Sequence, residues 1–517
     1  MSLFHKIKLM FISEIAERLP WALIAYICGI LIGLNTWISA YLYPVLALAF
    51  LSGLMWLWMR KKIFVSWYMM ILLMCSVGII NISLHVQMNK HPILLSPLYH
   101  ENIQATVLEN RLLIDKQIVT LTDIHWHNPD LKRPQKIRVH FKEKIPLLNV
   151  GDRIKTSVSV YPPKGPSEKN LWFQQIGAIG IADKMEIIFT FPKQNFSFSK
   201  IRHQINQHLF EILSLSQAEI AAPLITGEQK LISHNTYQTY RRAGIAHVLS
   251  VSGFHMALLA SFLFFMIRGI CAIFPRIALY WNTKKIAAVA SLIGTFLYLG
   301  LSGFQVPALR AFIMIAFVFV GVLIDRSVIS MRTLILTALG ILICFPQMIL
   351  SVSFQFSFIA VAVLVMLCSY IQDQPWSKFK KAVIGFIGLN VFVSLALIPF
   401  IAFYFHQLTP YGILGNMLFN SIFSFFIMPL LFVGALTMPF GWDVPFFRLA
   451  GLGLKGVGYG ANQLAGLPYS ELTIPSFSPI ALGMIGFGIM GVCFMKTPLK
   501  WSGMFLIILG IIGGLFP

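Results

Sequence analysis

Apolar stretches of about twenty residues recur along this chain from Trp21 to its last residue. A transmembrane helix needs roughly 20 consecutive apolar residues, because that length spans the hydrocarbon core of a bilayer. The chain has 517 residues, of which 57% are hydrophobic and 11% are charged. A soluble protein of this length would carry about twice that charge. The sequence therefore predicts a polytopic α-helical membrane protein.

The predicted spans number about 11–13 by hydropathy. Three precede residue 85, at about 21–37, 40–58 and 63–84, and the first is a retained span rather than a cleaved signal peptide. The Arg60-Lys61-Lys62 triplet between the second and third spans predicts a cytoplasmic loop. The N-terminus is then cytoplasmic, and residues 86–205 lie outside the cytoplasm. The later spans are predicted at 248–267, 286–303, 306–324, 333–349, 352–371, 383–404, 412–436, 479–495 and 500–516.

Two stretches leave alternatives open. Pro429 and Pro439 are expected to break the long apolar run that contains them into half-helices, which suits a passage lined by irregular backbone. The Gly-rich residues 446–467 are assigned either to the membrane interface or to a broken span.

The polar residues 86–200 carry the pattern of β-strands. Basic residues alternate with apolar ones in one run, at Lys136, Arg138, His140, Lys142 and Lys144. Further strands are expected at 103–109, 118–122, 155–160 and 185–191. Five short strands in about 100 residues favour a small β-barrel, and the OB-fold is one candidate.

The basic run has two interpretations. A charged outer face of a strand is the simpler one. The other is a track for a nucleic-acid backbone, with Trp126, Trp172 and Phe173 available to stack on bases. The net charge of the chain is +21, and residues 86–210 hold 17 Lys and Arg against 10 Asp and Glu, a difference of +7. An excess outside the cytoplasmic loops favours an anionic partner, either nucleic acid or lipid headgroups.

Residues 201–246 are predicted to form amphipathic helices at the membrane interface. Apolar residues recur there at helical spacing, at Ile201, Ile205, Leu209, Ile212 and Leu213.

No cofactor or metal site is expected. The six cysteines lie in or beside apolar runs, which is typical of buried small side chains. His125-Trp-His127 followed by Asp130 has the look of a metal-ligand string, but its aspartate is misplaced for the usual motif. A phosphate-binding loop of the Gly-x-x-x-x-Gly-Lys type does not occur either, so no ATPase is expected.

The most informative polar residues stand at the start of a long apolar run. Arg241 and Arg242 are followed by His247, the pair Ser252-Gly253, and His255. Histidines inside membrane segments usually face an interior or a cavity, so this group predicts either a polar passage or a set of helix contacts.

This segment resembles the characteristic segment of the ComEC family of competence proteins. A second run, from Ser302 to Ala311 with Gln305 and Arg310, resembles that family as well. An arginine toward the bilayer centre costs roughly 2.5–3.5 kcal/mol, so Arg310 should find water or a partner unless it snorkels to the surface. Weaker likenesses lie around Gln355 and around Asn416 and Asn420, which share one helix face.

The resemblance implies a function and a division of the chain. It implies a channel that passes single-stranded transforming DNA across the bacterial cytoplasmic membrane, and no enzyme. The domains are then residues 1–85 (N-terminal spans), 86–200 (extracytoplasmic OB-like domain), 201–246 (interfacial helices) and 247–517 (competence-type channel). The metallo-β-lactamase-like C-terminal domain common in that family is expected to be absent.

The same resemblance implies partners. They are single-stranded DNA, membrane lipid, a surface DNA receptor, a cytoplasmic helicase, single-strand binding proteins and a separate nuclease. Two other functions stay open: a permease for a small anionic solute that uses Arg310, and an intramembrane enzyme that uses His247 and His255 as acid and base.

Overall fold

The computed structural model describes residues 3–36, 49, 51–53, 63–89, 91–94, 96–112, 117–126, 133–141, 151–163, 168–189, 198–323, 330–474, 478–494 and 499–515. The chain forms two compact units. Unit 1 comprises Met1–Asn89, Arg326–Leu408 and Thr473–Pro517, and unit 2 comprises Lys90–Asp325 and Thr409–Leu472. Each unit is therefore built from segments that are distant in sequence.

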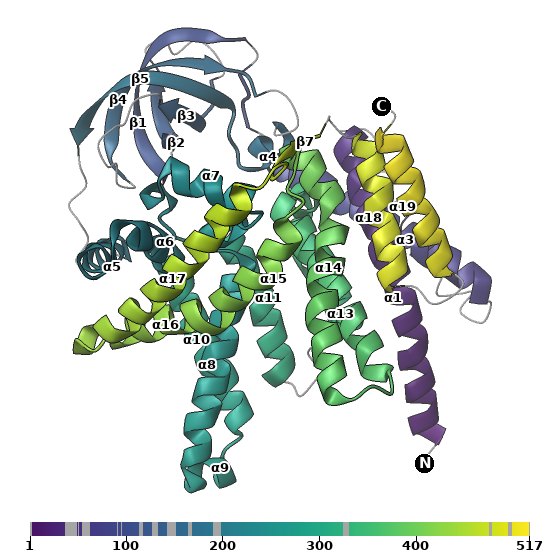
Figure 1. Cartoon of the computed structure of the whole chain (residues 1–517). Helices are drawn as coiled ribbons and strands as arrows, with labels where there is room; N and C mark the ends of the chain where they lie inside the picture. The colour runs from purple at the N-terminus through teal and green to yellow at the C-terminus, as the bar shows by residue number, and fades with distance from the viewer. Residues whose placement is uncertain are drawn as a thin grey trace. The chain divides into compact units, whose positions relative to one another are not determined.

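Unit 2 begins with a closed five-stranded barrel (Figure 1). Its strands are β1 (Leu98–Leu112), β2 (Gln117–Trp126), β3 (Ile137–Phe141), β4 (Arg153–Tyr161) and β5 (Ala178–Phe189). The order around the barrel is β1-β2-β3-β5-β4, and every pair is antiparallel except β3 with β5. The predicted five-stranded barrel of the OB type is confirmed.

Alternation within β3 fills the barrel core. Ile137, Val139 and Phe141 are buried and pair with β2 on one side and β5 on the other. The last strand begins at Ala178, seven residues before its expected start at Met185. The sequence there is Ala-Ile-Gly-Ile-Ala, whose small residues give a weak strand signal although Ala178 and Ala182 are buried.

The rest of unit 2 is helical. Between the barrel and residue 325 lie α4 (Glu168–Phe173), α5 (Phe198–Ile212), α6 (Leu215–Thr226), η1 (Gln229–Leu231), α7 (His234–Arg242), η2 (Ala246–Leu249), α8 (Gly253–Ile273), α9 (Pro275–Tyr280), α10 (Thr283–Leu301) and α11 (Val306–Leu323). The later segment contributes α15 (Gly412–Ile422), η4 (Phe423–Ile427), α16 (Met428–Thr437), η5 (Met438–Phe440) and α17 (Val444–Ala465).

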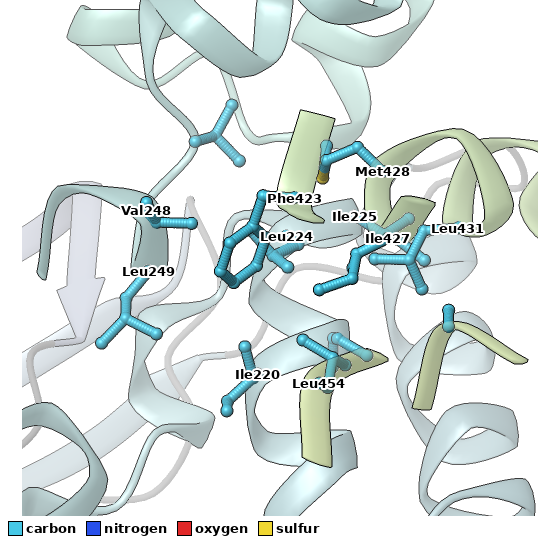
Figure 2. Packing of buried hydrophobic residues seen from close by; sticks show 14 of the residues in the cluster. Ile220, Leu224, Ile225, Val248, Leu249, Phe423, Ile427, Met428, Leu431 and Leu454 are labelled. Atoms are coloured by element: carbon cyan, nitrogen blue, oxygen red, sulfur yellow. The ribbon is translucent and has the colours of Figure 1, made fainter. Parts of the chain in front are cut away.

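A single hydrophobic core joins the two helical segments of unit 2. Leu224 of α6, Leu249 of η2 and Phe423 of η4 meet there with Ile427 and Leu454, all at most 2% exposed (Figure 2). The α5 helix is amphipathic as predicted, because Ile205 and Leu209 face this core. The α6 helix is buried from Ala218 to Thr226, so it forms part of the core itself.

The proline-containing run of unit 2 does not split as expected. The helix continues past Pro429, which stands near the start of α16, directly after the π-helical turn η4. A π turn changes the local hydrogen-bond register, which accommodates the N–H that proline lacks. Pro439 lies in η5, where the run ends. The Gly-rich stretch forms α17, one uninterrupted helix, which excludes a break within it.

Unit 1 is a helical bundle. Its elements are α1 (Leu3–Thr36), α3 (Ile63–Met88), α12 (Met331–Cys344), η3 (Pro346–Leu350), α13 (Val352–Asp373), α14 (Lys378–Phe405), α18 (Pro479–Phe494) and α19 (Leu499–Leu515). The two-residue strands β6 (Gln407–Leu408) and β7 (Leu472–Thr473) complete the described elements. Asn81 of α3 donates to the hydroxyl of Tyr26 (2.6 Å) and to the carbonyl of Leu342 (3.1 Å), which ties α1, α3 and α12 together.

Six of the described helices are long and apolar enough to cross a membrane. They cover Tyr68–Met88, Gly253–Ile273, Thr283–Leu301, Val352–Asp373, Lys378–Phe405 and Gly412–Phe440. Five shorter apolar helices cover Arg18–Leu34, Ala308–Leu323, Met331–Cys344, Pro479–Phe494 and Trp501–Gly514. The polytopic helical architecture is thereby confirmed. The span predicted at 40–58 lies outside the described residues apart from 49 and 51–53.

Candidate functional site

The segment 241–255 runs from the end of α7, through the short turn η2, to the start of α8. At the end of α7 the N–H of Gly244 donates to the Arg241 carbonyl and that of Ile245 donates to the Tyr240 carbonyl, both at 2.9 Å. Gly244 has φ of 75°, the left-handed conformation that commonly ends a helix in this bonding pattern. The turn η2 follows, and α8 then starts at Gly253.

This link packs tightly on α15. A side chain at Gly244 would collide with the Cα of Gly412, and one at Gly415 would lie 2.5 Å from the Ala243 carbonyl oxygen. The two backbones therefore touch, and neither side has room for a methyl group. The contact therefore holds the backbone just before His247 against α15.

The arginine pair at the end of α7 holds a carboxylate. The Nη2 atom of Arg241 donates to Oε1 of Glu471 at 2.5 Å, and Nε of Arg242 lies 3.7 Å from Oε2. The side chain of Arg242 is 55% exposed, whereas that of Glu471 is 22% exposed. Both arginines were predicted site residues, and Glu471 was not.

His255 is held in place by the start of its own helix. Its Nδ1 accepts from the backbone N–H of Ser252 (3.2 Å) and lies 3.0 Å from the Ser252 hydroxyl. This arrangement is a capping box, which satisfies N–H groups at the N-terminus of α8. The ring is fully buried, and its Nε2 makes no hydrogen bond, although the Ser250 backbone lies near the ring.

His247 lies close enough to His255 for the two rings to interact electrostatically. Its side chain is exposed, yet burial by the surrounding protein lowers its pKa from 6.5 to about 4. The protein atoms around the ring oppose its charged form, although part of the side chain reaches solvent. At neutral pH His247 is therefore uncharged.

Gln305 directly precedes α11, and Arg310 lies on this helix. The side-chain amide of Gln305 donates to the Gly227 carbonyl at 2.6 Å, so it ties this loop to the end of α6. Arg310 is 8% exposed on α11, one residue before Ala311, whose Cβ lies 3.5 Å from the position of a Cβ on Gly253. The snorkelling alternative for Arg310 does not fit such burial.

Asn416 and Asn420 lie one turn apart on α15, as predicted. The amide of Asn420 donates to the Asn416 side-chain oxygen at 3.4 Å, and the Oδ1 atom of Asn420 is buried without a hydrogen bond. Both follow Gly415 in the helix that touches the link. Arg241, Arg242, His247, Ser252, Gly253, His255, Gln305, Arg310, Asn416 and Asn420 thus all belong to unit 2.

Gln355 stands apart from this group, because it belongs to unit 1. Its amide donates to the Ile349 carbonyl at 2.8 Å, and its oxygen accepts from the Tyr404 hydroxyl at 3.0 Å. Its contacts are those of a residue that holds η3 against α13 and α14.

The barrel residues predicted to meet nucleic acid are partly engaged. Lys136 donates to Gln175 (2.9 Å) and Arg138 donates to Gln174 (2.6 Å). Both side chains and that of His140 are half-buried, while Lys142 and Lys144 lie outside the described residues. Trp172 is 5% exposed and packs edge-on against Phe173 at a centroid distance of 5.1 Å. It is therefore a core residue rather than a platform for bases.

Comparison with known proteins identifies the helical part of the chain. The model of a family described as "Competence protein" matches residues 224–499, which is 276 of 517 residues and more than half of the chain. The chain belongs to this competence family. The match contains the segment 241–255, Glu471 and the two asparagines, whereas the barrel strands precede it.

Three individual proteins are similar to less than half of this chain. "Recombination protein 2" of Haemophilus influenzae is 28% identical over 243 residues, 45% of this chain and 30% of that protein. "ComE operon protein 3" of Bacillus subtilis is 25% identical over 249 residues, 47% of this chain and 30% of that protein. "Competence protein ComA" of Neisseria gonorrhoeae is 27% identical over 217 residues. The chain thus spans about a third of the relatives it matches. No solved structure matches.

Buried or paired carboxylates are the site residues that the sequence did not reveal in this competence protein. Glu219 of α6 is 7% exposed and accepts from the Ser233 N–H (3.1 Å) and the Thr236 hydroxyl (2.5 Å). Residues 211–517 contain just seven acidic residues: Glu211, Glu219, Glu228, Asp325, Asp373, Asp443 and Glu471. A charge in so apolar a region needs a partner. The rarity of carboxylates could therefore have marked these few residues as candidates for paired sites.

Proposed function

We propose that this chain carries single-stranded DNA across the bacterial cytoplasmic membrane during competence. The relatives named for competence and recombination support this function. The single observation that carries it is the grouping of polar residues in the family segment. Two arginines, two histidines and Ser252 gather between the last turn of α7 and the first turn of α8, in a segment that packs on the helix bearing Asn416 and Asn420.

The chemistry of this group suits a strand of phosphates. Arg241 and Arg242 already bind an oxyanion, the carboxylate of Glu471, and a phosphodiester presents similar oxygen acceptors. His247 is uncharged at neutral pH, so it offers hydrogen bonds without adding a strong binding site. A passage must bind its substrate weakly enough to release it.

The remaining domains take roles consistent with this proposal. Residues 1–85 and 247–517 supply membrane helices, residues 86–200 form the extracytoplasmic OB-like barrel, and 201–246, apart from the buried helix α6, lie at the interface. The barrel handles incoming DNA by way of Lys136, Arg138 and His140, together with Lys142 and Lys144. Five-stranded barrels of this kind bind single strands through basic grooves and aromatic side chains.

The proposal also names partners. A surface receptor delivers DNA, a separate nuclease removes one strand, and a cytoplasmic helicase with single-strand binding proteins draws the other inward. The chain itself is placed in the cytoplasmic membrane with its N-terminus inside and residues 86–205 outside.

A deletion strain tests this function. Cells lacking the gene should still capture labelled DNA at the surface but should fail to bring label into the cytoplasm, and the wild-type gene should restore import. Import at the wild-type rate without the gene would refute the proposal. Loss of surface capture as well would assign the chain to an earlier step. Import of a small labelled anion instead of DNA would favour the permease.

A further inference from the structure

The arginine pair of unit 2 is occupied by a carboxylate from its own chain. Glu471 lies in the loop after α17, about 230 residues from the arginines in sequence, and yet one oxygen faces each of them. The Arg241 contact is a short hydrogen bond of 2.5 Å, whereas the Arg242 contact at 3.7 Å is an ion pair without a hydrogen bond. The carboxylate therefore accepts a hydrogen bond from Arg241 and is attracted by the charge of Arg242.

The exposed fractions of the two arginine side chains show how a second anion can reach them. The side chain of Arg242 is 55% exposed, and that of Arg241 is 29% exposed. A phosphate can approach the guanidinium of Arg242 from solvent while Glu471 still holds Arg241. Arginine pairs with carboxylate and phosphate through the same planar set of N–H donors, so one anion can replace the other.

The loop that carries Glu471 is attached at points other than the arginines. The Tyr411 hydroxyl donates to the Pro468 carbonyl at 3.0 Å, and the Ser470 hydroxyl donates to the Ala465 carbonyl at 3.1 Å. Between them Tyr469 has φ of 59°, a conformation uncommon outside glycine. The Glu471 side chain can consequently leave the arginines while the loop keeps its place on α15 and α17.

We propose that Glu471 is a tethered competitor for phosphate at Arg241 and Arg242, which the DNA backbone displaces when a strand binds. The inference rests on the proposed function, because it assigns these arginines to the DNA path. A tethered anion lowers the affinity of the pair for phosphate without abolishing it. When no DNA is bound, Glu471 keeps the arginines paired. When a strand moves on, Glu471 replaces the departing phosphate at the arginines.

Binding of a labelled 15-nucleotide single strand to the full-length protein in lipid nanodiscs tests this competition. Glu471→Gln keeps the shape of the side chain but removes its charge, and it should tighten binding roughly 2- to 5-fold at low salt, the upper part of the range for losing one partly exposed ion pair. Glu211→Gln is the matched control, because it removes the same charge from a residue that pairs with His208 instead. The control should change the affinity less than 2-fold on the scale of an exposed pair.

The outcomes separate the two proposals. If neither the wild type nor the Arg241→Ala, Arg242→Ala double variant binds DNA, the proposed function fails. If the wild type binds, the double variant does not, and Glu471→Gln binds equally or more weakly, the competitor role fails. Glu471→Asp covers the case in which the glutamine variant does not accumulate. It keeps the charge but shortens its reach by one methylene, so its affinity should exceed that of the wild type, and an affinity at or below the wild type overturns the inference.

Discussion

His247 and His255 stand eight residues apart but lie in different surroundings. His255 is fully buried, and its ring is fixed by Ser252 at the start of α8. Part of the His247 side chain is exposed, and desolvation by the surrounding protein lowers its pKa. The first ring serves mainly to begin a helix, and under the proposed function the second is the one that a DNA strand would contact.

The lowered pKa of His247 predicts a pH dependence of stability. Its folded value of about 4 lies below the ordinary 6.5, so the folded state binds fewer protons than the unfolded state between these values. Stability should therefore fall as pH is lowered from 6.5 to 4. His247→Gln should flatten this part of the curve of melting temperature against pH in detergent. The control is His203→Gln, at an exposed position on α5, and a curve that steepens or stays unchanged in the His247 variant contradicts the assignment.

Substitution of Arg310 tests the role of a buried cation in α11. Arg310→Ala should block DNA import while the protein still accumulates in the membrane, and Arg310→Lys should restore part of the import if charge is what matters. Lysine keeps the charge but loses the planar fork of donors. Import and membrane abundance are measured in the same cells. Normal import by the alanine variant would make Arg310 structural.

Single residues stood out in the sequence where polarity contradicts an apolar setting, and their role in a passage for DNA stays a prediction. Arg241, Arg242, His247 and His255 stood out for that reason, and unit 2 brings them together. Glu471 was missed because its partners lie about 230 residues away, and no local pattern encodes such a pairing. The placement of Trp172 was left open by the sequence, because composition does not tell a stacking platform from a core residue, and its 5% exposure decides for the core.

At the scale of elements, the contact between the link 243–245 and α15 organises the site. Gly244 on one side and Gly412 with Gly415 on the other allow the two backbones to touch. Small residues commonly permit such approach between membrane helices. The contact joins the two sequence segments of unit 2 where the polar residues gather.

Substitution of Gly244 should break this contact. Gly244→Ala places a methyl group against Gly412 and puts alanine in the left-handed conformation, which alone costs roughly 1–2 kcal/mol. The variant should melt lower and reach the membrane in reduced amounts. The matched control is Gly269→Ala on α8, where nothing lies within 4 Å of the added carbon. Equal melting temperatures for the two variants would show that the close approach is not needed.

Elements were predicted best where the periodicity is local. The spans expected at 286–303 and 352–371 match α10 and α13 within a few residues, and the alternation around Ile137 gave β3. The π turn before Pro429 was not expected, because it depends on hydrogen bonds that the sequence does not specify. The early start of β5 was hidden by its alanines and glycine.

At the scale of the whole molecule, the charge distribution predicts the topology. Ser157→Cys on β4 and Ser377→Cys before α14 are both exposed positions. In a cysteine-free background, a membrane-impermeant thiol reagent added to intact cells should label the first and not the second, because basic loops such as Lys378–Lys381 stay in the cytoplasm. The second position should react after permeabilisation. The reverse pattern would invert the topology.

The most direct test of the account is to find which residues touch DNA during import. A photo-reactive amino acid is placed at Ser250, between His247 and Ser252, or at Phe265, which is 67% exposed on α8. Only variants that still import labelled DNA are irradiated. Adducts with single-stranded DNA are expected at position 250 and none at 265. Normal import with adducts at 265 but none at 250 would contradict a path along the link between α7 and α8.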